Sequence, residues 1–288
     1  MFAAQLKNEL VKLFGKKRTY IGFGVFTIAQ LLMLLMFKYT RWQSDFARLL
    51  AGNGYLASDY ISALTVGLVM LLPQLGLLMP LYVALVGGDL VAKESEDGTL
   101  RMILSRPITR LRLLIVKWLA GAIYTAVLVL ALGIIAVVFA RLYFPWKGMF
   151  VFFQPPPHVD LASVHRVFSL FSPDEGLRLY VLSHFFIVLN IITLMSVAFM
   201  FSCFNMKPAA ATILALSYLF ANTVVQNIPF FARYQSWFIT YHLQCWFWVY
   251  QSPVPWAQIL QSEIILLAAN ATAFIIGAVG FQMRDIKS

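Results

Sequence analysis

Few residues of this chain have the types and spacing that catalysis requires. An intramembrane aspartyl protease needs two acids at membrane depth, and Gly87-Gly88-Asp89 offers one, at the edge of an apolar run. Thr99 and Ser105 have no base at useful spacing, and no Ser/His or His/Glu constellation lies within an apolar run. The sequence also lacks the Gly-x-x-x-x-Gly-Lys-Ser/Thr phosphate loop and any Cys/His spacing typical of metal ligands. We therefore expect a chain that is not an enzyme and binds no cofactor or metal of its own.

The polar segment that could bind a partner covers residues 87–110. It holds four of the chain's twelve acidic residues, interleaved with several arginines. Its centre reads Lys93-Glu94-Ser95-Glu96-Asp97-Gly98-Thr99-Leu100-Arg101 and continues, after Met102 and Ile103, with Leu104-Ser105-Arg106-Pro107-Ile108-Thr109-Arg110. Asp97-Gly98 is a turn signal, Leu100 and Leu104 fall on one apolar stripe, and Pro107 ends any helix. This pattern predicts a short surface helix that docks into a groove on a soluble partner. A merely solvated loop is the alternative, and it leaves the interleaved acids unexplained.

Such a segment must be held by the apolar elements around it, and these are unusually long. Of the 288 residues, 61% are hydrophobic and 12% are charged, whereas a soluble domain has about 25% charged residues. Six runs free of Asp, Glu, Lys and Arg reach the length of about 20 residues that a membrane-spanning helix needs. They are Thr19–Phe37, Ile61–Gly88, Trp118–Ala140, Leu179–Met206, Pro208–Phe231 and Ile264–Met283. The predicted fold class is an all-α membrane protein with six transmembrane helices in a single transmembrane domain, 1–288. The fifth helix is expected to end before Pro229.

The net charge of +10 fits membrane anchoring rather than nucleic-acid binding, because the basic residues cluster beside the apolar runs. With six spans, fourteen of the 22 Lys and Arg residues fall on the side that holds both termini and residues 89–112. The positive-inside rule then places both termini in the cytoplasm. Cys203 and Cys245 fall near opposite membrane faces, so no disulfide between them is expected.

Two features on the cytoplasmic side and in the second span have structural consequences. Residues 2–15 carry Leu6, Leu10, Leu13 and Phe14 at helical spacing, which predicts an N-terminal interfacial amphipathic helix. A helix packed on another protein is the alternative. The second run contains Pro73 and Pro80, which predicts a broken or kinked helix with Gln74 beside the first kink.

Two outer segments connect the later spans. In the outer loop 141–178, Leu161, Val164, Val167, Phe168 and Phe171 recur at helical spacing and predict an interfacial helix. Ser172-Pro173-Asp174-Glu175 is typical of a helix start. Residues 228–257 hold eleven aromatic residues, interrupted by Arg233, Pro253 and Pro255. We expect a re-entrant or interfacial hairpin there, with a seventh span as the alternative.

The segment from Lys93 to Arg110 resembles the loop after the second span in permease subunits of ABC-2-type exporters, close to the small stand-alone bacterial permeases. The interfacial first helix, the six spans and the outer segment between spans five and six are similar too. The resemblance implies a coupling helix that docks a separate ATPase subunit. The docking residues would be Lys93, Glu94, Glu96, Gly98, Thr99, Leu100, Arg101, Leu104 and Pro107. It further implies a homodimer with two ATPase copies, which bind the ATP and Mg, in the bacterial inner (cytoplasmic) membrane.

Polar groups inside the runs are candidates for a transport path. In the ABC-2 family, spans two and five line the central path, and this implies roles for Gln74, Asn222 and Gln226 in translocation. Glu263, near the outer end of span six, joins them because intramembrane ionisable groups are costly. Each of these groups could instead link helices within the bundle or reach the membrane interface. The surrounding Leu, Met and Phe residues favour a hydrophobic or amphipathic substrate.

Two other functions fit the same sequence. One is a non-transporting membrane assembly or scaffold protein that recruits a cytoplasmic partner through residues 93–105. The other is a secondary transporter, which would carry ionisable residues near mid-membrane for proton or sodium coupling. The chain has few such residues, and this disfavours the secondary transporter.

Overall fold

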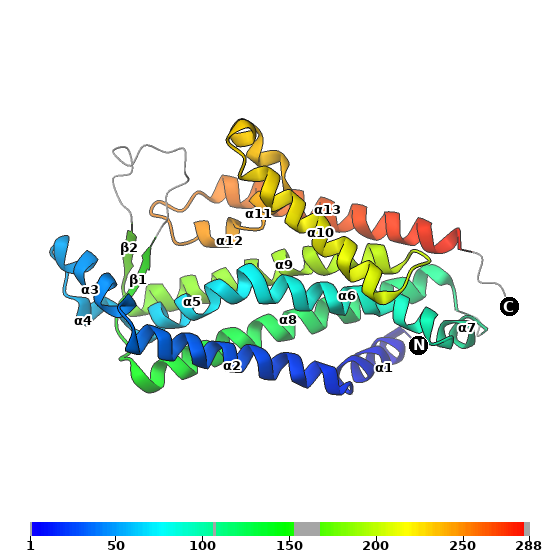
Figure 1. Ribbon diagram of the computed structural model, residues 1–288, viewed down its shortest axis with the longest axis horizontal. Coiled ribbons are helices and arrows are strands. Elements are labelled where there is room, and N and C mark those ends of the chain that lie inside the picture. Colours follow the sequence, from blue (N-terminus) through cyan, green and yellow to red (C-terminus); the bar gives the residue numbers. More distant parts are fainter. Residues whose placement is uncertain (1, 106–107, 153–167, 285–288) are drawn as a thin grey trace.

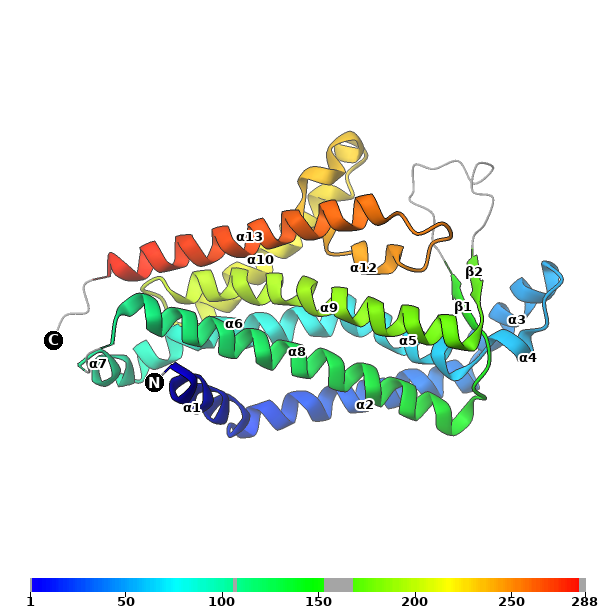
Figure 2. The same cartoon turned by 180° about the vertical axis from the view of Figure 1, so that it is seen from behind.

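The computed structural model describes residues 2–105, 108–152 and 168–284. Within these residues, six helices are long and apolar enough to cross a membrane. They run along one axis as an elongated bundle, with α1 beginning and α13 ending at the end where α7 lies (Figure 1). The opposite end carries α3, α4 and the two strands (Figure 2).

The first half of the chain forms α1 (Phe2–Phe14), α2 (Lys17–Tyr39), α3 (Trp42–Gly52) and α4 (Ala57–Tyr60). The second span is α5 (Ala63–Pro73), a π-helical segment η1 (Gln74–Leu78) and α6 (Met79–Glu96). After α7 (Thr99–Leu104), the third span is α8 (Arg110–Tyr143). The amphipathic helix predicted for residues 2–15 is confirmed as a helix, and its apolar stripe packs against the core beside α8.

The second half begins with strands β1 (Met149–Phe152) and β2 (Phe168–Phe171), which pair antiparallel with Met149 opposite Phe171. Helices α9 (Pro173–Ser202), α10 (Pro208–Gln226) and α13 (Trp256–Gln282) are the last three spans. Between α10 and α13 lie the 3₁₀ segment η3 (Pro229–Trp237), α11 (Ile239–His242) and α12 (Cys245–Trp248). Helix α9 is the centre of the bundle, because it packs against α6, α8, α10 and α13.

Several local predictions are confirmed. Ser172 caps α9: its hydroxyl accepts a hydrogen bond from the Glu175 amide at 3.3 Å, and Pro173 occupies the first turn. Helix α10 ends at Gln226, before Pro229. The second span is interrupted directly after Pro73, where a five-residue π segment begins at Gln74.

Other predictions are corrected. Phe168–Phe171 is a strand and not part of an interfacial helix, because this short aromatic run pairs with Met149–Phe152. Residues 161–167 of that predicted helix lie outside the described residues. The third and sixth spans begin earlier than the apolar runs, at Arg110 and Trp256. The charged side chains within these helices find partners or reach solvent, so a charge does not end the helix.

Candidate functional site

A cluster of four charged side chains joins three helices at the α7 end of the bundle. Lys117, on α8, has a side chain that is 1% exposed, and its Nζ lies 2.7 Å from Glu94 Oε2 on α6. The same Nζ lies 3.1 Å from Glu9 Oε2 on α1. Lys12, also on α1, forms an ion pair with Glu94, and its Nζ lies 3.9 Å from Glu9. We call Glu9, Lys12, Glu94 and Lys117 the charge cluster.

The charge cluster is balanced, because two carboxylates face two ammonium groups. A buried charge is tolerated only when it is paired, and removing one member leaves the others desolvated without compensation. Burial acts to lower the pKa of Lys12, but the hydrogen bond from Lys12 to Glu94 and the charges of Glu94, Glu9 and Asp97 together outweigh it and raise the pKa above its ordinary value. The cluster therefore holds α1 against both the end of α6 and the start of α8.

The structure corrects one expectation for the docking residues. Glu94 was expected to contact a partner, but its side chain is 8% exposed and points into the charge cluster. The reason is that α6 continues past Gly88 to Glu96 with Val91 buried in the core, and its last turn meets Lys12 of α1 and Lys117 of α8 through ion pairs. Glu94 therefore positions the helix end rather than offering a carboxylate at the surface.

The remaining docking residues fall into exposed, buried and undescribed groups. Lys93 forms ion pairs with Glu96 at 2.9 Å and Asp97 at 3.2 Å on the exposed side of α6. Leu100 is buried in the core, whereas Arg101 is exposed. The side chain of Leu104, and the whole of Pro107, lie outside the described residues. Among the described side chains of α7, the exposed ones are Arg101 and its neighbour Met102.

A tight turn connects α6 to α7. Gly98 has φ +71°, in the left-handed region where side chains are disfavoured, and directly follows the last residue of the α6 cap. The Asp97 amide donates to the Lys93 carbonyl at 2.9 Å, and the hydroxyl of Thr99 donates to the Glu94 carbonyl at 3.3 Å. The Thr99 bond links the first turn of α7 directly to the last turn of α6.

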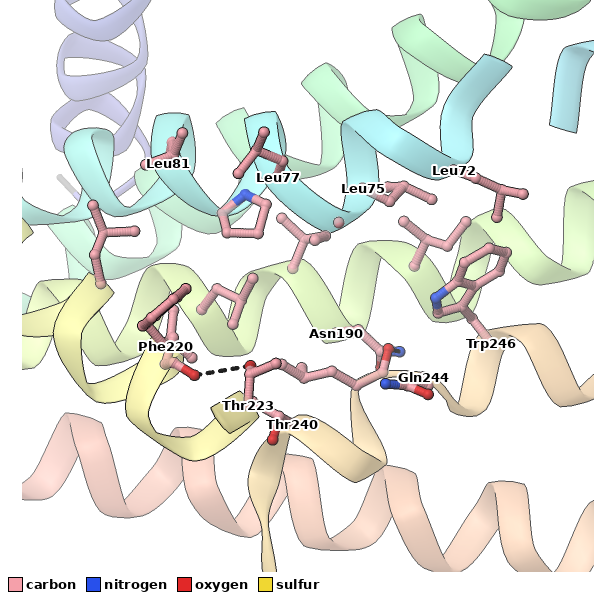
Figure 3. A pocket seen from close by; sticks show the side chains of 18 of the residues that line it. Leu72, Leu75, Leu77, Leu81, Asn190, Phe220, Thr223, Thr240, Gln244 and Trp246 are labelled. Atoms are coloured by element: carbon pink, nitrogen blue, oxygen red, sulfur yellow. Dashed lines mark hydrogen bonds between the residues drawn. The ribbon is translucent and has the colours of Figure 1, made fainter. Parts of the chain in front are cut away.

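A cavity of about 640 Å³ lies next to the π segment of that span. Its walls come from the second span, α9, α10 and the α11–α12 region, and we call it the α5–α10 cavity. Most lining residues are aliphatic or aromatic, with Leu72, Leu77 and Phe220 among them (Figure 3). The polar lining residues are Asn190, Ser217, Thr223, Thr240 and Gln244. The cavity thus offers neutral hydrogen-bonding groups within an apolar wall, which is typical of small-molecule sites.

The four predicted path residues do not line this cavity. Gln74 belongs to the π segment, but its buried amide donates to the Met70 carbonyl at 3.2 Å. Asn222 donates to the Tyr218 carbonyl at 3.2 Å on α10. Gln226 lies behind the cavity wall, where its Oε1 accepts a hydrogen bond from Thr240 at 2.5 Å. Gln226 therefore orients a lining residue rather than meeting the cavity itself.

Glu263, on α13, does not line the cavity either. It is 5% exposed, and its Oε1 lies 3.2 Å from the Sγ atom of Cys245. Asn190 contacts the same Sγ atom at 3.6 Å and donates to the Leu243 carbonyl at 3.0 Å. The Cys245 thiol has its pKa raised to about 12 by burial and, secondarily, by the charge of Glu263. Asn190 thus connects the cavity wall to Cys245 and Glu263.

Sequence reasoning did not single out Glu9, Lys117, Ser217, Thr223, Thr240 or Gln244. Lys117 was included only in the count of basic residues on the side that holds both termini, and Glu9 was given no role. A weak signal existed for Glu9 and Lys12, which lie three residues apart, where side chains on a helix meet. The other four polar residues are brought to the cavity by tertiary packing.

The six long apolar helices make the chain a multi-pass α-helical membrane protein. The family model described as "Protein of unknown function (DUF2705)" matches residues 25–286, so the chain belongs to this family. No curated protein matches the chain.

Proposed function

We propose that this chain is the permease subunit of an ATP-driven exporter of the ABC-2 type. In this proposal, two copies form the membrane path, and a separate ATPase subunit docks on α7. Both termini and α7 lie on the cytoplasmic side of a bacterial inner membrane. The ATP and Mg bind to the ATPase partner, and this chain couples ATP hydrolysis to movement of a substrate.

The observation that carries the proposal is the continuity of the second span. A tight turn joins α7 to α6, and α6 is continuous with the π segment, which contributes Leu75, Gly76 and Leu77 to the cavity wall. A force applied to α7 is therefore transmitted along α6 to the cavity. Short π segments inside α-helices frequently occur at functional sites.

The cavity supports an apolar or amphipathic substrate. Its lining residues carry no formal charge, and the polar ones are amides and hydroxyls. Leu77 and Phe220 line the cavity and are also exposed, so a second copy could close it at their side. Homodimers are the most common oligomers, and this agrees with the proposed pairing.

A scaffold that recruits a cytoplasmic partner without transport is the competing function. It uses the same exposed surface of α7 but needs no cavity. The two functions differ in whether the bound partner hydrolyses ATP and whether a substrate moves.

The test is affinity purification of the tagged chain from native membranes, with ATPase activity assayed on the eluate. Arg101→Glu changes the exposed surface of α7 without touching the charge cluster, and Arg48→Glu on α3 is the matched control at the opposite end of the bundle. We expect an ATPase subunit in equal copy number with wild type and the control, and its loss with Arg101→Glu. A folded protein that yields a partner without ATPase activity would establish the scaffold function instead.

A further inference from the structure

A second cavity, of about 610 Å³, lies between α2, α3, α5 and β1, at the end of the bundle opposite α7. We call it the α3–α5 cavity. Its volume falls within the range of about 300–1,000 Å³ that small-molecule sites occupy. The lining residues are Met33, Trp42, Asp45, Phe46, Leu49, Leu68, Val69, Leu72, Pro73, Phe150, Val151, Phe152 and Phe247. All of them except Asp45 are apolar or aromatic.

The position of Asp45 on α3 is unusual. Trp42, Asp45, Phe46 and Leu49 occupy positions i, i+3, i+4 and i+7, so they form one face of the helix, and all four line the cavity. An amphipathic helix usually carries apolar residues at all such positions. The cavity therefore has an apolar body and one carboxylate, with the indole of Trp42 three residues from it on the same helix face.

We propose that the α3–α5 cavity binds an amphipathic organic cation, with the apolar part of the ligand in the cavity body and the positive charge at Asp45. A carboxylate attracts a cation, and the face of an indole adds a cation–π attraction. The competing partner of Asp45 is Arg48, whose Nη1 lies 3.8 Å from Oδ1, and both side chains are largely exposed, at 77% and 60%. Such an exposed pair is weak, so a ligand cation can replace Arg48 at little cost.

Asp45 has a second effect, which determines how the proposal must be tested. It lies in the first turn of α3, where a negative charge stabilises the helix dipole. A change in stability on mutation of Asp45 therefore does not identify a ligand site. Only a difference between charged and neutral ligands of the same shape does so.

This inference does not depend on the proposed transport function. The α3–α5 cavity is separate from the α5–α10 cavity, although Leu72 contributes to the walls of both. A chain that acts only as a scaffold could still bind an organic cation here.

The experiment measures binding of radiolabelled tetraphenylphosphonium to the full chain in lipid nanodiscs, with empty nanodiscs subtracted. Unlabelled benzyltriphenylphosphonium serves as the cationic competitor, and triphenylphosphine oxide serves as the neutral one. We expect displacement by the cation and little displacement by the neutral compound. Asp45→Asn should weaken binding about tenfold, the size expected for one partly exposed charge with a cation–π partner.

Two further variants control this result. Asp59→Asn removes an exposed acid at the same end of the bundle that pairs with Lys147 at 3.0 Å and does not line the cavity, so binding should be unchanged. Leu49→Trp fills the cavity from a partly exposed helix and should abolish binding while the protein stays folded. The proposal is overturned if Asp45→Asn binds like wild type, if both Asp variants weaken binding equally, or if the neutral compound competes as well as the cation. The last result would identify a lipid-like apolar occupant.

Discussion

Replacement of Lys117 by methionine tests whether the charge cluster holds the α7 end of the bundle together. The Nζ atom lies 2.7 Å from Glu94 and 3.1 Å from Glu9, with 1% of the side chain exposed. At an effective dielectric constant of about 20, these attractions are worth about 6 and about 5 kcal/mol before desolvation is subtracted. Removal of one member of a buried cluster typically costs about 3–5 kcal/mol, because the remaining charges stay buried. We expect Lys117→Met to lower the free energy of unfolding by that amount.

The assay is equilibrium unfolding in mixed micelles with increasing denaturing detergent. Lys93→Met is the matched control, because Lys93 lies on the same end of the bundle but forms only surface ion pairs, and it should change stability little. The triple variant Glu9→Gln, Glu94→Gln, Lys117→Met should recover part of the loss, because the one charge left in the cluster is that of Lys12, whose side chain is 42% exposed and reaches solvent. Equal stability of Lys117→Met and wild type would refute the reasoning, as would a triple variant less stable than the single one.

Three further outcomes follow from individual groups. Gly98→Ala should destabilise the protein by about 1 kcal/mol in the same assay, because the φ angle of Gly98 is +71°. The control is Gly52→Ala in α3, which should not destabilise the protein because no atom lies near the added Cβ. Burial raises the pKa of Cys203 and Cys245 to about 12, so a maleimide at neutral pH should label neither thiol quickly until the protein is unfolded, and rapid labelling would contradict their placement. The pKa of Lys12 in the folded protein lies above its ordinary value of 10.5. The stability that its ion pairs contribute is therefore complete below pH 10.5 and is lost as the pH rises through the higher pKa of the folded state. Protease cleavage of α1 should therefore be unchanged around neutral pH and increase only in strongly alkaline buffer.

Much of the scaffold was predictable from the sequence, because the membrane leaves few alternatives. A run of about 20 apolar residues must satisfy its backbone groups internally, so the six spans could be found from composition alone. The serine cap at Ser172 and the interruption after Pro73 were also predictable, because they depend on local chemistry. The predicted limits of two spans were wrong, because each apolar run was ended at a charged residue. Helix α8 in fact contains Lys117, and α13 contains Glu263.

The site was less predictable, because its residues come together only in three dimensions. Glu94 looks like a surface residue in a charged loop, and only the arrival of Lys12 and Lys117 from other helices buries it. The polar residues of the α5–α10 cavity, such as Thr223 and Thr240, are ordinary residues whose role depends on their neighbours. Helix α3 was not predicted either, because eleven residues with one apolar face give a short signal.

The π segment also sets the helical phase of the second span. A π turn holds about one residue more than an α turn, so its conversion to α-helix would rotate α6 by about 100° relative to α5. Such a rotation would carry Glu94 away from Lys117 unless α8 turned with it. The ion pairs of the charge cluster therefore oppose this rotation, together with the packing of α6 against α9 and α10, and they help to keep Leu75 and Leu77 in the wall of the α5–α10 cavity.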